Sequence, residues 1–117
     1  MSDASPPRAL GDIGSRLLFE NDRVRVWLLT LEPGERSATH EHELDYLLVK
    51  IAGDTVGLEP EPDTGSEWKD PGEWPVKPGQ VDFIERGGIE TAHNPGNERY
   101  HEVIIELKDP PGLRPSE

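Results

Sequence analysis

The stretch GERSATHEH, residues 34–42, carries the strongest signal for the fold of this chain of 117 residues. It contains two histidines, His40 and His42, with one residue between them. Side chains alternate between the two faces of a strand, so in a strand both imidazoles would point the same way. Neutral imidazole is a common ligand for Fe, Mn, Zn, Ni and Cu. The stretch therefore predicts a strand that carries half of a metal site, although such a pair also occurs at surfaces and in packing.

Short strand-like segments occupy most of the chain on either side of this stretch. Apolar residues cluster in four regions, which are Leu17–Leu31, Leu44–Leu58, Val81–Ile89 and Val103–Leu107. The runs within them are short and rich in β-branched residues, and none shows a helical period of useful length. Turn signals separate the runs, and 12 glycines and 12 prolines supply them. The pattern predicts an all-β sandwich or barrel.

The two ends of the chain differ from its middle. Residues 1–16 are rich in proline, glycine and serine and predict a loose N-terminal arm. Residues 109–117 predict a proline-rich tail, because proline lacks the backbone donor and fixes φ. A chain of this length forms one domain. We therefore predict a single folded domain over residues 17–108.

The segment Glu59–Pro75 interrupts the rhythm of strands and turns. Its composition predicts a polar loop, and it carries two of the three tryptophans, Trp68 and Trp74. Aromatic side chains bury large apolar areas, so the pair is expected to cover an open end of the core. Two alternatives remain, in which the loop closes a pocket or packs on a neighbouring subunit.

The overall composition excludes several classes of function. The net charge of −12 and the pI near 4.6 disfavour partners such as nucleic acid or an anionic membrane surface, because both require clustered Lys and Arg. The chain has no cysteine, which rules out disulfides, thiolate zinc sites and cysteine nucleophiles. The N-terminus shows no signal peptide, and no run approaches the ~20 apolar residues of a membrane span. We expect a cytoplasmic protein.

A second half-site lies around Glu90, fifty residues after His40. On a regular strand Glu90, Ala92 and Asn94 would share one face, and Thr91 and His93 would point the opposite way. The carboxylate of Glu90 is therefore expected on the same face as two small or polar neighbours. His93 is expected behind the ligands rather than among them.

Strand parity thus selects His40, His42 and Glu90 as candidate metal ligands. Two histidines and one carboxylate with open positions are the arrangement that non-haem iron oxygenases use. If the first strand stays regular, Tyr46 shares the face of the two histidines, and we expect its hydroxyl to orient a substrate as the candidate catalytic residue. His101 falls outside this argument and is expected to be structural or exposed.

Taken together, these residues resemble the cupin superfamily over about residues 17–108. The first cupin motif runs Gly, five residues, His-x-His, three or four residues, Glu, six residues, Gly, and is matched here by Gly34, His40, His42 and Gly53. The second runs Gly, five residues, Pro-x-Gly, two residues, His, three residues, Asn, with variable spacing before the His. Gly72, Pro78 and Asn94 match it here, and Gly79 matches it with a shift of one place, because it directly follows Pro78.

Two positions depart from the cupin pattern. Tyr46 stands where the first motif has its glutamate, and Glu90 stands where the second motif has its histidine. Tyrosine is a poor metal ligand, because its ordinary pKa near 10 keeps the phenol protonated. The resemblance therefore implies either a variant site on His40, His42 and Glu90 or a pocket that has lost its metal.

The resemblance also implies a fold and an assembly. The fold would be a double-stranded β-helix, which is a jelly-roll barrel, and small cupins usually pair as homodimers. The opening, Glu20–Trp27 followed by Leu31–Gly34, resembles small single-domain cupins, including those linked to β-alanine degradation.

Two main functions follow for this protein. In the first, a divalent metal on the variant site acts on or binds a small organic substrate by dioxygenase- or isomerase-type chemistry. In the second, the protein is a metal-free, non-catalytic binder or sensor of a small molecule, since one fold hosts many functions. A scaffold role rests only on the tryptophan-bearing loop and the acidic surface.

Overall fold

The computed structural model describes residues 9–110. Within this range the chain forms nine β-strands and no helix. The strands are β1 (Arg16–Glu20), β2 (Val24–Leu31), β3 (His40–Glu41), β4 (Asp45–Ala52), β5 (Thr55–Pro60), β6 (Gly72–Pro75), β7 (Val81–Ile84), β8 (Ile89–His93) and β9 (Tyr100–Leu107). The all-β prediction is confirmed. Since the described residues contain no helix, they contain none that could cross a membrane.

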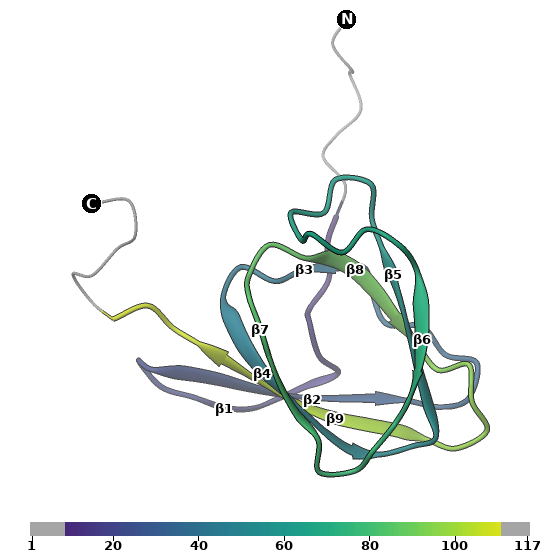
Figure 1. Cartoon of the computed structure of the whole chain (residues 1–117). Helices are drawn as coiled ribbons and strands as arrows, with labels where there is room; N and C mark the ends of the chain where they lie inside the picture. Colours follow the sequence, from purple (N-terminus) through teal and green to yellow (C-terminus); the bar gives the residue numbers. More distant parts are fainter. Residues whose placement is uncertain (1–8, 111–117) are drawn as a thin grey trace, which may run out of the picture.

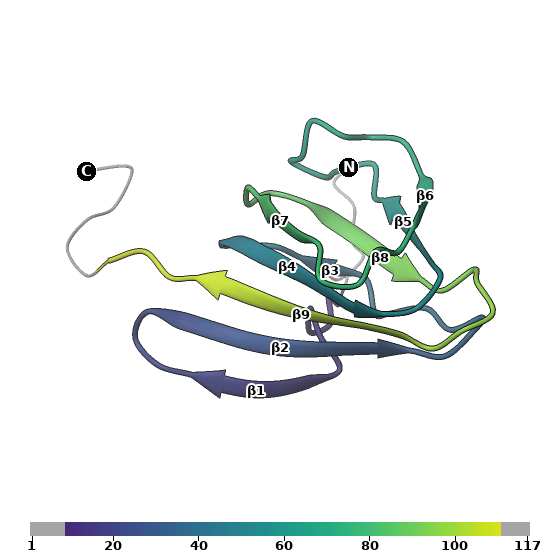
Figure 2. The ribbon, with the colours of Figure 1, turned by 60° about the horizontal axis from the view of Figure 1, so that its bottom comes forward.

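The strands form two antiparallel sheets that face each other (Figures 1 and 2). The large sheet has the order β1-β2-β9-β4-β7, and the small sheet has the order β3-β8-β5-β6. Neighbours in a sheet are often far apart in sequence, as β9 lies between β2 and β4. These long-range pairings produce the predicted jelly-roll double-stranded β-helix, and they bring the stretch at 40 beside the stretch at 90.

The core lies between the two sheets. Its buried apolar side chains are Ile13, Leu29, Leu31, Tyr46, Val56, Val76, Ala92, Tyr100 and Ile104. The central strand β9 alternates strictly between buried and half-buried residues, as expected for a strand with one face on the core. Its buried set includes two carboxylates, Glu102 and Glu106, which hydrophobicity alone would place outside.

The outer face of the large sheet is apolar as well. Directly paired residues share a face, and the outward pairs include Val26 with Ile105, Val49 with Val103, and Leu47 with Phe83. An antiparallel sheet with one solvated face normally alternates apolar and polar residues. In this large sheet the positions that face outward are more apolar than the positions that face the core.

The boundaries of the irregular segments differ from the sequence-based expectation. The expected arm, residues 1–16, lies partly outside the described residues, but from Gly11 on it packs against the barrel. The N–H of Gly11 donates to the carbonyl of Thr39 at 2.8 Å, Ile13 is buried, and β1 begins at Arg16. The backbone of this segment thus finds partners despite its loop-like composition.

The loop expected over residues 59–75 is shorter than the sequence suggested. Its two ends belong to strands, because β5 continues to Pro60 and β6 begins at Gly72. These two strands pair with each other, and Pro75 is tolerated because β6 is the edge strand of the small sheet. Pro60 is the last residue of β5, where the strand ends. Of the expected tail, residues 109–117, only Asp109 and Pro110 lie within the described part, and Asp109 forms an ion pair with Arg86.

Candidate metal centre

The pairing of β3 with β8 brings the three predicted ligands together. His40 lies directly opposite Glu90 in the register of these strands. Beyond the end of β3 the ladder continues, since the N–H of His42 donates to the carbonyl of Gly88 and the N–H of Gly87 donates to the carbonyl of His42, both at 2.8 Å. This backbone contact holds the second imidazole in line with the first.

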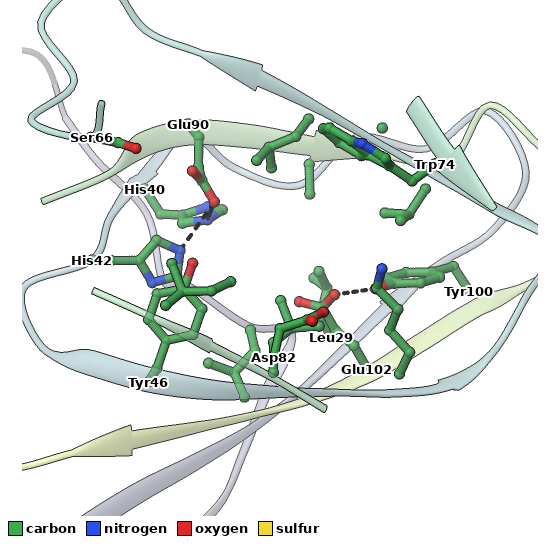
Figure 3. A pocket seen from close by; sticks show the side chains of 18 of the residues that line it. Leu29, His40, His42, Tyr46, Ser66, Trp74, Asp82, Glu90, Tyr100 and Glu102 are labelled. Carbon is green, nitrogen blue, oxygen red and sulfur yellow. Dashed lines mark hydrogen bonds and ion pairs between the residues drawn. The ribbon is translucent and has the colours of Figure 1, made fainter. Parts of the chain in front are cut away.

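The side chains of the three residues converge on one point (Figure 3). The Nε2 atom of His42 lies 3.3 Å from Oε2 of Glu90, and the Nε2 atom of His40 lies 3.9 Å from the same oxygen. One candidate ligand atom from each residue lies within 4.8 Å of the others. Both imidazoles are buried. The three residues therefore form a cluster that could bind a metal ion.

The surroundings of His40 prepare it as a ligand. Its Nδ1–H donates to the carbonyl of Ala38 at 2.8 Å, because a carbonyl can only accept. That tautomer leaves the lone pair of Nε2 directed at the cluster. Burial, followed by the neighbouring His42, lowers the pKa of His40 below its ordinary value. The ring is thus held in its neutral, metal-binding form.

The other two members of the cluster also fit a cation. Glu90 is largely buried, and its ion-pair contacts among residues 9–110 are with the two imidazoles, His40 and His42. A buried carboxylate is costly without a cationic partner, and a divalent ion between these atoms would supply one. The Nε2 atom of His42 is the one that faces the cluster, and its Nδ1 atom is buried without a hydrogen-bond partner within the described range.

Tyr46 lies in the same pocket, as strand parity predicted. Its ring stacks on that of His42, with centroids 4.1 Å apart and an angle of 16° between the planes. Burial, with the charges of Glu90 and Glu102, raises its pKa well above the ordinary value. The phenol therefore stays protonated and can donate a hydrogen bond, but it is not suited to bind a metal as phenolate. Leu44, which a regular strand would place on the same face, does not line the pocket.

The cluster occupies one end of a cavity of about 280 Å³ between the sheets (Figure 3). Apolar side chains from both sheets also line it, including Leu29, Leu48, Val56, Leu58, Ile84 and Ile104. Trp68 and Trp74 also line it, with ring centroids 4.8 Å apart. The loop that carries Trp68 is anchored near the cluster, since the N–H of Ile89 donates to the hydroxyl of Thr64 at 2.9 Å. The tryptophans thus form a wall of the pocket.

Polar residues that the sequence interpretation missed line the same cavity. They are Lys50, Asp82, Tyr100 and Glu102, all on the large sheet. The hydroxyl of Tyr100 donates a short hydrogen bond to Glu102. The spacing of Tyr100, Glu102 and Ile104 along β9 was the available signal, because alternate residues share a face.

The remaining histidines and Asn94 lie outside the cavity. His93 faces away from it, as predicted, and lies 3.8 Å from Glu59 and 3.7 Å from Glu73. The Nδ1 atom of His101 lies 3.0 Å from the hydroxyl of Thr30 on the outer face of the large sheet. The amide of Asn94 donates to the carbonyls of Leu31 and Glu98, which gives it a structural role between β8 and β9.

Comparisons with known proteins agree with this architecture. No family model and no curated protein matches the sequence. Among solved structures, a cupin domain from Bordetella pertussis Tohama I is similar with a TM-score of 0.70 and 23% identity, over 80% of this chain and 91% of that one. An RmlC-like cupin family protein from Methanocaldococcus jannaschii is similar with a TM-score of 0.60 and 15% identity, over 84% of this chain and 94% of that one. A sugar phosphate isomerase from a cupin superfamily, from Silicibacter pomeroyi DSS-3, is similar with a TM-score of 0.52 and 22% identity, over 75% of this chain and 52% of that one.

The fold and the pocket therefore define a jelly-roll β-barrel with a candidate metal site between its sheets. This is the double-stranded β-helix of small single-domain cupins, and the predicted cupin fold is confirmed. At these identities the similarity shows the fold alone. The resemblance to cupins linked to β-alanine degradation stays a prediction.

Proposed function

We propose that this cupin-fold protein binds a divalent metal ion through His40, His42 and Glu90 and holds a small organic substrate beside it. The observation that carries the proposal is the convergence of three ligand atoms within 4.8 Å at the buried end of a cavity. Fe, Mn, Zn, Ni and Cu all accept imidazole and carboxylate ligands. Three protein ligands also leave positions open for a substrate.

A metal bound there would act as a Lewis acid on an oxygen-bearing substrate, in dioxygenase- or isomerase-type chemistry. The residues around it have separable tasks. The protonated hydroxyl of Tyr46 would donate a hydrogen bond that orients the substrate. Trp68 and Trp74 would exclude water from the cavity, which strengthens polar contacts inside it. The positive charge of the loaded site would attract an anionic or chelating group.

Elemental analysis of the natively purified protein tests the metal site. We expect about one metal ion per chain in the wild type and a tenfold or greater loss in His42→Ala, as for other ligand removals. His93→Gln is the matched control, because this histidine faces away from the cavity, and it should retain the metal. Equal and negligible metal in all three proteins would reject the proposal.

A metal-free binder is the second candidate, and the mostly apolar pocket with its tryptophan wall favours it. In this case an organic ligand would raise the melting temperature of chelator-treated protein as much as that of untreated protein. Loss of the stabilisation together with the metal would rule this candidate out and leave the metal-dependent function.

A further inference from the structure

The end of the cavity away from the metal cluster carries a second group of polar side chains. Glu102 and Tyr100 project from β9, Lys50 lies directly opposite Glu102 on β4, and Asp82 projects from β7. Figure 3 shows Tyr100 and Glu102 displaced along the pocket from His40, His42 and Glu90. None of these four residues has a task in the metal site.

Glu102 is only 5% exposed, so its place in the pocket needs a physical reason. Burying a carboxyl group destabilises a protein unless the group is paired or neutral. Burial, which outweighs the hydrogen bond from Tyr100, raises the pKa of Glu102 to about 7. The fold therefore keeps at this position a group whose charge is only partly compensated.

Glu106 shows how the same strand satisfies a carboxylate that is purely structural. It is also buried, but Nε of Arg25 lies 2.5 Å from it and Nε1 of Trp27 donates to it at 2.8 Å. Glu106 does not line the main cavity. Glu102 has no such guanidinium among residues 9–110 and faces the cavity instead, which is the arrangement expected of a group that meets a ligand.

The charges at the two ends of the cavity are complementary to a two-ended molecule. A divalent ion with Glu90 would leave a net positive charge at the cluster. At the other end Asp82 and ionised Glu102 outweigh the single cation of Lys50. Apolar side chains line the space between. A cavity of about 280 Å³ lies at the lower limit for ligand pockets, so the molecule must be small.

From this arrangement we infer that the pocket binds a short aliphatic molecule with a carboxylate at one end and an ammonium group at the other. The carboxylate faces the metal cluster, and the ammonium donates hydrogen bonds to Glu102 and Asp82. The carboxylate half of this inference rests on the proposed metal site. The ammonium half rests on Glu102 and Asp82 and can be tested without a metal.

Calorimetric titration with three molecules of one chain length tests both halves. The probes are 5-aminopentanoate, pentanoate and pentylamine, added to metal-loaded protein. We expect 5-aminopentanoate to bind about tenfold or more tightly than pentanoate, because hydrogen bonds between charged groups contribute most. Glu102→Gln should abolish this preference and leave the affinity for pentanoate unchanged. Tyr100→Phe keeps the carboxyl group of Glu102 and should retain the preference. It is the variant to measure if Glu102→Gln does not fold.

Glu106→Gln is the matched control, because it removes a buried carboxylate of the same strand outside the cavity. It should keep the preference for the amino acid even if it lowers stability. Equal binding of 5-aminopentanoate and pentanoate by the wild type, or an unchanged preference in Glu102→Gln, would overturn the inference. Chelator-treated protein separates the two proposals, because pentylamine should still bind there in a Glu102-dependent way even if the metal site proved wrong.

Discussion

At the scale of single residues, the buried carboxyl group of Glu102 gives the protein a measurable dependence on pH. Its pKa in the folded state, about 7, lies above the ordinary value of 4.5. Between these two values the folded state binds more protons than the unfolded state, so stability falls as the pH rises. The fall in stability is complete only about one pH unit above the folded-state pKa, where Glu102 is ionised in both states.

We therefore expect Glu102→Gln to become more stable relative to the wild type as the pH rises from 5 to 8. The full difference is on the order of 3 kcal/mol, since one unit of pKa corresponds to about 1.4 kcal/mol. Urea denaturation of both chelator-treated proteins at several pH values measures it. A difference in stability that does not change with pH would show that Glu102 titrates normally.

The metal cluster and the polar group at Glu102 differ in how far the sequence could predict them. His40, His42 and Glu90 come from strand parity within two short segments, and the structure brings them together. Glu102 and Tyr100 were not found, because a polar residue in an apolar strand is ordinarily assigned to solvent. Only the neighbours of β9 in the sheet decide which of its faces is buried.

At the scale of elements, two glycines of the first motif have separable roles. Gly34 and Gly53 both have positive φ values, +87° and +126°, which favour glycine. A Cβ atom at Gly34 would meet nothing within 4 Å. A Cβ atom at Gly53, in the turn between β4 and β5, would lie 3.0 Å from Cδ1 and 3.1 Å from Cα of Tyr100. The turn is therefore packed against a residue of the pocket.

Gly34→Ala should destabilise the protein by about 1 kcal/mol, the usual strain of a positive φ. Gly53→Ala should cost about 2–3 kcal/mol, because steric contact with Tyr100 adds to the strain. Chemical denaturation of the two variants under one condition compares them. Equal losses would mean that the backbone of Tyr100 adjusts freely and that the turn does not position it.

The large sheet shows why element assignment from sequence stops short of orientation. Strand β2 lies in the apolar region Leu17–Leu31, and Val24, Val26 and Leu28 form its most regular apolar set. A rule that places apolar residues inward would bury this set. In the structure Arg25 and Trp27 face inward, since they contact the buried Glu106, and the valines face outward. Strand β2 pairs with the central strand β9, and a single sequence does not reveal this pairing. The face of β2 that is turned inward is therefore the opposite of the one that its apolar pattern would suggest.

At the scale of the whole molecule, the large sheet exposes an apolar outer face, and exposed apolar patches often mark interaction surfaces. Val81, Phe83 and Ile51 are 55%, 58% and 47% exposed on adjacent strands, and Val49 and Val103 continue the face. Five strands about 4.8 Å apart and up to eight residues long span roughly 500 Å² in plane. This is the same order as the ~800 Å² per partner that a stable interface buries.

The predicted homodimer is the occupant that suits this face. Two chains of net charge −12 repel each other, so they can approach closely only through a surface without charged side chains. Phe83, Val81, Ile51, Val49 and Val103 provide that surface. We propose that two copies pack through the outer faces of their large sheets, which leaves the metal cluster and the cavity of each copy unobstructed.

Sedimentation equilibrium at micromolar concentration tests this assembly. The wild type should have twice the chain mass of 13.0 kDa, and Phe83→Glu should have the mass of a single chain. Phe83→Lys should also be monomeric although it reduces the negative charge, which separates loss of the apolar contact from added repulsion. Leu17→Glu is the control, because Leu17 pairs with Trp27 on the opposite face and its replacement should leave the dimer intact. A monomeric wild type, or a dimer that survives both Phe83 substitutions, would show that something other than a second copy covers this sheet.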